Sequence, residues 1–384
     1  MMLGVVGTLS ALLHYYLWAR LVRDALLPQP WARVATIAIV ALGALLPIAM
    51  PLTRLLPRTT TWPFSALVYT WMGVLFLAFL LVVVGDVVRL GVAASALLRP
   101  DVVASPERRT LLRQSIAAIA AIGAVSIGAF GIYEARAAIR IAKVRVALKR
   151  LPKSMAGLTF AQLSDVHVGN TIGHDFLADL VRRTNALSPD VIVITGDLVD
   201  GSVKELSAHV APLADLKAPL GVYFVTGNHE YYSGADEWIA ELQRLGIRVL
   251  HNERVELRRG DDAIDLAGID DWSAAQFGGG HGPDLASALE GRDSTRELIL
   301  LAHQPRAIEE AAERGVGLQL SGHTHGGQIW PWNYLVLLQQ PYVAGLHRHR
   351  DAQIYVSRGT GYWGPPMRVG APAEITQITL EQEA

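Results

Sequence analysis

Five short segments of the chain carry residue types that bind metal ions, and each follows an apolar run. The segments hold Asp165 and His167, Asp197 and Asp200, Asn228 and His229, His303, and His323 and His325. A single segment of this kind is common on a protein surface or in a turn. Five of them in order, each after an apolar run, predict one metal centre.

The chain contains no cysteine, so it can form neither a disulfide nor a thiolate ligand to a metal. Any bound ion must therefore be held by imidazole, carboxylate or amide oxygen. This ligand set suits manganese, iron or zinc, and the sequence does not distinguish among the three.

The apolar runs have the length and composition of strands in an α/β sheet that is packed by helices. We expect strands at residues 158–163, 191–195, 222–226, 298–302, 318–321, 353–357 and 375–380. Helices are expected at residues 175–186, 203–216, 235–245 and 306–314. Because sites in such sheets form at the carboxyl ends of the strands, the five polar segments should meet in one crevice.

The spacing within two segments gives a first expectation for the ligands. Residues two apart in extended chain point the same way, so Asp165 and His167 can grip one ion. By the same reasoning, His323 and His325 can reach toward one centre. Glycines beside the segments, such as Gly196, permit the tight turns and close backbone approach that these loops need.

This order of motifs resembles the calcineurin-like metallophosphoesterase superfamily over residues 157–384. The resemblance implies a metallophosphoesterase-type β-sandwich flanked by helices. The loop at residues 322–328 and the stretch at residues 357–366 are also similar to a bacterial membrane-associated phosphodiesterase subgroup.

The resemblance assigns roles to the candidate residues. It makes Asp165, His167 and His325 ligands of one metal, and Asn228, His303 and His323 ligands of the other, with Asp197 bridging the two. Two cations about 3.5–4 Å apart would polarise the phosphoryl oxygens and activate a water molecule. The resemblance therefore implies two divalent transition-metal ions and hydrolysis of a phosphoric ester.

The resemblance also implies a proton donor for the leaving group. His229 is the expected general acid, with Asp200 as the carboxylate that orients it. Gly201 stands where phosphoprotein phosphatases of this superfamily have an arginine, which makes a phosphoprotein substrate less favoured. We interpret Glu230 as structural, and His281, in a glycine-rich run, as a turn residue rather than a ligand.

The first third of the chain is apolar enough to cross a membrane, and the chain as a whole has a mean hydropathy of +0.29. Four runs, at residues 3–21, 34–52, 64–84 and 116–133, are each long enough to span a bilayer as a helix. A signal peptide is the alternative for the first run, but no basic residue precedes it and three further runs follow. We therefore expect a transmembrane region at residues 1–133. Within it, His14 is interpreted as a helix-packing residue.

The N-terminal and C-terminal parts of the chain differ in net charge. Residues 1–133 hold 10 basic and 4 acidic side chains, whereas residues 154–384 hold 17 and 30. The acidic surplus would repel a phosphate backbone, so nucleic acid is not expected as a partner. Residues 134–156 are basic, and they form either a linker that contacts lipid head groups or the first strand of the residue 157–384 domain.

These observations predict a membrane-anchored phosphoesterase that hydrolyses a phosphodiester or pyrophosphate of a phosphorylated small molecule or a lipid-linked substrate. A membrane sensor that binds such a ligand without turnover is the alternative. Basic residues in the first and third loops favour an integral inner-membrane protein with its catalytic domain outside. Residues 330–338, rich in tryptophan and leucine, form either buried core or a segment that enters the membrane interface.

Overall fold

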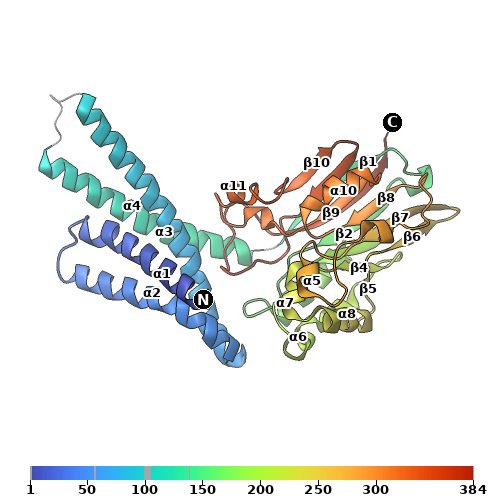
Figure 1. Ribbon diagram of the computed structural model, residues 1–384, viewed down its shortest axis with the longest axis horizontal. Helices are drawn as coiled ribbons and strands as arrows, with labels where there is room; N and C mark the ends of the chain where they lie inside the picture. Colours follow the sequence, from blue (N-terminus) through green and yellow to red (C-terminus); the bar gives the residue numbers. More distant parts are fainter. Residues whose placement is uncertain (1, 56–57, 99–104, 138, 384) are drawn as a thin grey trace. The chain divides into compact units, whose positions relative to one another are not determined.

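The computed structural model describes residues 2–55, 58–98, 105–137 and 139–383. The chain divides into a helical unit, residues 1–133 together with 364–367, and a sandwich unit made of residues 134–363 and 368–384. Each unit has its own secondary structure (Figure 1).

The helical unit contains four long helices. These are α1 (Met2–Trp18), which continues as a π-helical turn at Ala19–Arg23, α2 (Trp31–Leu55), α3 (Arg58–Leu98) and α4 (Pro106–Arg136). Each of them contains a segment long and apolar enough to cross a membrane. The four expected runs overlap these four segments.

His14 is a buried polar side chain within the helical unit. His14 on α1 accepts a hydrogen bond from Nε1 of Trp71 on α3 (2.9 Å), and its Nδ1 lies 2.8 Å from the carbonyl oxygen of Ser10. Gly43 on α2 packs against the same imidazole, since a Cβ at Gly43 would lie 3.0 Å from it. His14 therefore packs where three helices meet, as the sequence predicts.

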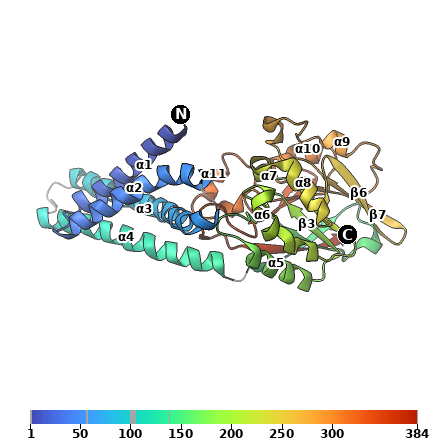
Figure 2. The same cartoon turned by 90° about the horizontal axis from the view of Figure 1, so that it is seen from below.

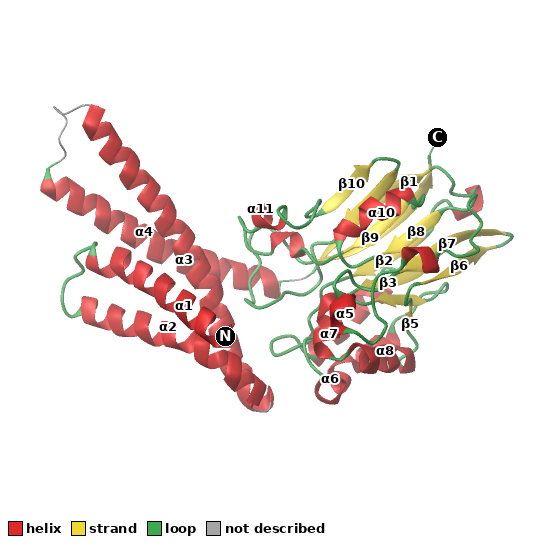
Figure 3. Ribbon diagram, viewed as in Figure 1, coloured by secondary structure: helices red, strands yellow, loops and turns green. Residues whose placement is uncertain are grey.

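The sandwich unit contains two six-stranded mixed sheets (Figure 3). The first has the order β1 (Arg140–Leu148), β12 (Glu374–Gln382), β2 (Thr159–Leu163), β3 (Val191–Thr195), β4 (Val222–Val225) and β5 (Arg248–Val249). The second has the order β10 (Gly345–His349), β11 (Ala352–Val356), β9 (Leu318–Ser321), β8 (Leu298–Leu301), β7 (Asp262–Gly268) and β6 (Glu253–Arg259).

Successive side chains along a strand point to opposite faces of the sheet, so each sheet contributes apolar side chains to two core layers, one between the sheets and one beneath the helices. Phe160 and Val193 of the first sheet pack with Leu266, Ile299 and Leu320 of the second in the layer between the sheets. The alternate residues of each strand face outward and meet helices. The central parallel strands of both sheets are thus buried on two faces, which explains why they read as continuous apolar runs.

Helices cover the outer face of each sheet. The first sheet is covered by α5 (His174–Ala186), α6 (Val203–Val210) and α8 (Ala235–Arg244) (Figure 2), and α7 (Asn228–Ser233) follows β4. The second sheet carries α9 (Leu285–Ala288) and α10 (Ile308–Glu313), while α11 (Asn333–Val336) lies in the connection between β9 and β10. The predicted fold class, a β-sandwich flanked by helices and preceded by four membrane-type helices, is confirmed.

Several elements differ from the sequence expectation. Strands β5, β6, β7 and β10 were not expected, because they are short or carry polar residues on one face. The basic segment after α4 contains β1, which pairs in parallel with β12. Its basic side chains lie on the exposed positions of that edge strand.

Candidate metal centre

Parallel strands bring the five polar segments together. Strands β2, β3 and β4 are adjacent and parallel, and so are β8 and β9 in the second sheet. Leu163 pairs with Ile194, and Leu301 with Leu320, so neighbouring strands end close to the same level. The loops that follow them carry the candidate ligands from both sheets to one edge of the sandwich.

The loops hold their polar side chains in a backbone conformation that L-residues rarely adopt. Asp165, His167, Asp197, His323 and His325 all have φ between +50° and +71°. The expected extended alternation is therefore wrong, because the chain turns sharply at each of these residues. Such strain persists only where the surrounding structure enforces it, and it is typical of functional sites.

Two neighbouring glycines allow this packing. Gly196 has φ of +82°, and a Cβ there would lie 2.6 Å from the backbone nitrogen of Gly227 and 2.7 Å from Nδ1 of His303. A Cβ at Gly322 would collide with the side chains of Ser164 and Asp165. Any larger residue at either position would push the ligand loops apart.

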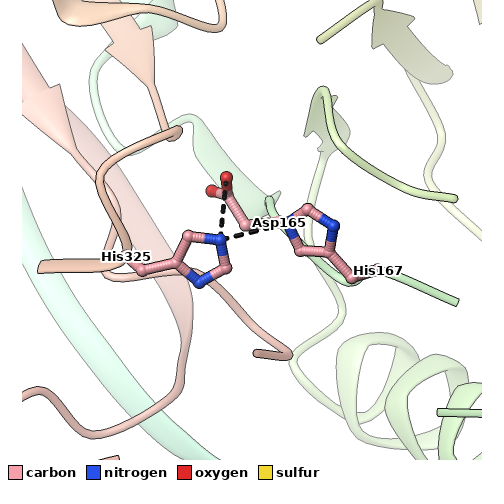
Figure 4. Close-up of side chains that lie close together, drawn as sticks. All are labelled: Asp165, His167 and His325. Atoms are coloured by element: carbon pink, nitrogen blue, oxygen red, sulfur yellow. Dashed lines mark hydrogen bonds and ion pairs between the residues drawn. The ribbon is translucent and has the colours of Figure 1, made fainter. Parts of the chain in front are cut away.

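The first group of candidate ligands is Asp165, His167 and His325 (Figure 4). Nε2 of His325 lies 3.0 Å from Nε2 of His167 and 3.6 Å from Oδ1 of Asp165. The carboxylate of Asp165 also accepts hydrogen bonds from the backbone N–H of His323, at 2.9 and 3.1 Å. All three side chains are buried.

The second group is Asp197, His303 and His323. Nε2 of His303 lies 3.1 Å from Oδ2 of Asp197 and 3.2 Å from Nδ1 of His323. His303 is fixed by its other ring nitrogen, which donates to the carbonyl oxygen of Thr195 at 2.7 Å. His323 and His325 thus belong to different groups, as the resemblance implies.

Asp197 lies between the two groups. Its Oδ2 is 3.8 Å from Nε2 of His167 in the first group and 3.1 Å from His303 in the second. Burial favours the neutral form of Asp197, but the nearby His303 and His229 outweigh burial and hold its pKa well below the usual range. The carboxylate is therefore charged and available to both groups.

The donor set fits metal ions. Oδ1 of Asn228 is buried, and within the described part of the chain no hydrogen-bond partner reaches it. In both groups two imidazole nitrogens face each other at 3.0–3.2 Å, an arrangement that a shared cation stabilises. Burial also lowers the pKa of His323 to about 3 and that of His325 well below its usual range, which keeps both rings neutral, as metal ligands must be.

His229 and Asp200 form a separate pair beside these groups. Nδ1 of His229 lies 2.5 Å from Oδ1 of Asp200, which also lies 3.2 Å from Nδ1 of His167. Burial disfavours the charged imidazole, but Asp197 and Asp200 outweigh burial and raise the pKa of His229 to about 9. His229 is thus protonated at neutral pH.

Known proteins show the same domain and the same general organisation. The family model for calcineurin-like phosphoesterase matches residues 158–327. A "Transmembrane protein with metallophosphoesterase domain" of Danio rerio is 36% identical over 397 residues, which cover 98% of this chain and 88% of that protein. The chain belongs to the calcineurin-like phosphoesterase family. It is therefore a metal-dependent phosphoesterase by family.

Two further relatives extend the comparison. The Bos taurus protein of the same description is 42% identical over 331 residues, covering 83% of this chain and 74% of that protein. An "Uncharacterized metallophosphoesterase" of Helicobacter pylori is 40% identical over 252 residues, covering 65% of this chain and 66% of that protein. Calcineurin-like phosphoesterases related to this chain thus occur in animals and bacteria, and two are described as transmembrane proteins.

Glu230 has a positioning role in this calcineurin-like site. Its buried carboxylate accepts hydrogen bonds from the backbone N–H groups of Gly227 (2.6 Å), Asp197 (3.0 Å), Leu198 (2.8 Å) and Val199 (3.3 Å). It therefore clamps the turn that carries Asp197. Glu230 is therefore structural, as the sequence analysis predicts. Its position next to Asn228 and His229 was the sequence feature that could have indicated a role in supporting the site.

Arg368 was missed from the sequence. Its buried guanidinium donates to the carbonyl oxygens of Arg358 (2.7 Å), Ala371 (2.8 Å) and His325 (3.3 Å), and it also lies 3.4 Å from Nδ1 of His325. Arg368 thus supports the loop of a candidate ligand. No motif in the sequence signals this role, because it depends on the burial of a lone arginine.

The segment after the last ligand loop is exposed on the sandwich unit. The side chains of Trp330, Trp332, Tyr334, Leu335, Leu337 and Leu338 are all exposed, and Leu338 reaches 80%. The buried-core alternative for this segment is therefore wrong. An aromatic and aliphatic surface follows directly on the His323 and His325 loop.

Proposed function

We propose that the chain is a membrane-anchored phosphoesterase that uses two metal ions to hydrolyse a phosphodiester or pyrophosphate bond. The observation that carries the proposal is the pair of ligand groups that share Asp197, each with its imidazole nitrogens turned toward a common point. A single ion would leave one of these groups without a function.

Each ligand has a place in this proposal. Asp165, His167 and His325 would hold one ion, Asn228, His303 and His323 the other, and Asp197 both. When bound, such ions supply the positive charge that polarises a phosphoryl group and lowers the pKa of a coordinated water. The unpartnered Oδ1 of Asn228 supports its inclusion, because a buried amide oxygen without a partner is costly unless it coordinates a ligand.

His229 would donate a proton to the leaving oxygen. Its Nδ1 faces Asp200, so its Nε2 is left to face the substrate. Ring contacts with Tyr232 and Trp363, at centroid distances of 5.4 and 5.6 Å, hold the imidazole in this orientation. A sensor that binds a phosphorylated ligand without turnover would have no use for an oriented proton donor, so the pair favours an enzyme.

The substrate is proposed to be linked to lipid. Four membrane-type helices belong to the chain, and the exposed segment at residues 330–338 follows the ligand loop of the second sheet. Tryptophan and tyrosine prefer the membrane interface, where one end of the ring is apolar and the other hydrated. Such a segment would bring a lipid phosphate within reach of the metal ligands.

We further propose that the protein is a multi-pass inner-membrane protein with the sandwich unit on the outer side. The support is the excess of basic residues in two of the three loops, which the positive-inside rule would keep in the cytoplasm. The residues are Arg20, Arg23 and Arg33 for the first loop, and Arg89, Arg99, Arg108, Arg109 and Arg113 for the third. Fused at Ala384, a reporter that works only outside the cytoplasm should be active, and one that works only inside it should be inactive.

The experiment uses the full chain in lipid nanodiscs, stripped of metal and reloaded with manganese, iron(II) or zinc. Turnover is then measured on a panel of phosphodiesters, phosphomonoesters and lipid pyrophosphates. We expect hydrolysis of a diester or pyrophosphate that depends on added metal and on His229. Tight binding of a panel compound with no turnover under any metal would favour the sensor instead.

A further inference from the structure

A third set of ligand-type side chains lies outside the two groups that share Asp197. It consists of His251, which follows β5, Asp270, which follows β7, and His281 in the glycine-rich loop beyond it. Ligand atoms of these three residues all lie within 4.8 Å of one another. Nδ1 of His251 is 2.5 Å from Oδ1 of Asp270, and Nδ1 of His281 is 3.6 Å from Oδ2.

His281 lies in a turn, as the sequence predicts, with its backbone N–H donating to the carbonyl oxygen of Gly278, and its side chain is held in one orientation. Its side chain is only 10% exposed, and its Nε2 lies 3.0 Å from Oδ1 of Asp236. Its Nδ1 is buried, and it has no hydrogen-bond partner among the residues that the structure describes. A histidine that binds metal through one ring nitrogen usually donates its other N–H to a carboxylate in this way.

The gap between His281 and Asp270 fits a coordinated ion better than a hydrogen bond. A separation of 3.6 Å is too long for an N–H···O hydrogen bond. Two ligand atoms that each lie about 2.1 Å from a tetrahedral zinc ion are separated by roughly 3.4 Å. Asp270 itself is 2% exposed and accepts hydrogen bonds from His251 and from the backbone N–H of Gly282, and a cation would balance the charge of this buried carboxylate further.

We propose that His251, Asp270 and His281 form an additional binding site for a divalent transition-metal ion such as zinc. Two imidazoles and one carboxylate are a donor set that zinc accepts, with water in the fourth position. The proposal does not depend on the chemistry assigned to the two groups that share Asp197.

This ion would brace a loop that contacts the neighbourhood of His229. Gly278, Gly279 and Gly280 are consecutive residues with positive φ, so this part of the loop gains little rigidity from its own side chains. The ring of Phe277, in the same loop, lies 5.3 Å from that of Tyr232, and Tyr232 lies 5.4 Å from His229. A metal cross-link between the loop and two strand ends would therefore hold the aromatic wall beside the proton donor.

The test counts metal in the full chain in detergent. Stripped protein is reloaded with zinc and dialysed, and the bound zinc is measured by inductively coupled plasma mass spectrometry. We expect the double variant His251→Gln and His281→Gln to bind one ion fewer per chain than the wild type, which is two against three when both positions beside Asp197 are filled. The matched control His174→Gln, which changes an exposed histidine outside all three sets, should bind as many as the wild type.

A second variant tests the orientation of His281. Asp236→Asn weakens the acceptor for its Nε2–H, so the third ion should remain but bind about 10- to 100-fold more weakly. Equal numbers of bound ions in the wild type and the double variant would overturn the proposal, whatever the number bound by the groups that share Asp197. If the double variant does not fold, anomalous scattering at the zinc edge from wild-type crystals tests instead whether an ion is bound between the three side chains. A peak between the three side chains supports the site, and the absence of one contradicts it.

Discussion

The groups around Asp197 and the set around Asp270 use the same residue types but are built differently. The Asp197 groups draw candidate ligands from four strand ends in two sheets, or five when the proposed ligand Asn228 is included, and five of these residues have positive φ. The Asp270 set follows two strand ends and includes a histidine from a glycine-rich loop. The difference indicates that packing already fixes the side chains around Asp197, whereas the Asp270 set would gain rigidity from the ion proposed for it.

The largest expected effect is that of Asp197→Ala. This change removes the only carboxylate that the two proposed metal positions share, so most of the catalytic metal and nearly all activity should be lost. Metal content and turnover of a soluble diester give the measurement. The His251→Gln and His281→Gln double variant serves as the comparison and should keep its activity within about tenfold, because it changes loop rigidity rather than chemistry. Similar losses of activity in both variants would mean that the Asp197 groups and the Asp270 set do not differ in their importance for catalysis.

The next effect is that of His229→Gln, which should retain metal but slow turnover by about 10²- to 10⁴-fold, the range for a lost general acid. The loss should shrink for aryl esters, whose leaving groups need no proton. Metal content and rates on matched aryl and alkyl diesters are the measurement. An equal loss on both esters would mean that His229 does not donate the proton.

A smaller effect is expected for Glu230→Gln. The amide would place an N–H donor against backbone N–H groups that now share a carboxylate. The free energy of unfolding should fall by about 1–3 kcal/mol, and affinity for the catalytic metals by about 10- to 100-fold. Thermal denaturation and metal titration measure the two losses, with the exposed Glu290→Gln as control. If metal affinity were unchanged, Glu230 would stabilise the fold without positioning the metal ligands.

The smallest effect is expected for Trp332→Ser combined with Leu337→Ser. Both side chains are exposed, so the fold and both metal sites should be unaffected. Turnover of a lipid phosphate in vesicles should fall by about tenfold, since partial burial of two such side chains in the interface is worth roughly 1–2 kcal/mol. Turnover of a small soluble diester should stay the same. A parallel loss on both substrates would remove the support for a lipid-linked substrate.

The sequence predicted the features that rest on a recurring local pattern, an apolar run followed by a segment with metal-binding residue types. Each of the seven expected strands is present, and the candidate ligands gather because each follows a parallel strand of one of the two sheets. The sharp turns at Asp165 and His323 could not be predicted, since positive φ is set by tertiary packing around non-glycine residues. The role of Arg368 and the role proposed for His281 depend on burial and on partners from distant segments, so neither has a local pattern.

The most direct test of the two-metal proposal is a metal titration of the His251→Gln and His281→Gln variant, followed by turnover of a phosphodiester. This variant removes the additional site, so every bound ion belongs to the groups that share Asp197. We predict no turnover in the stripped protein and full activity only when two ions per chain are bound. Full activity in the stripped protein, or at one ion per chain, would contradict the proposal.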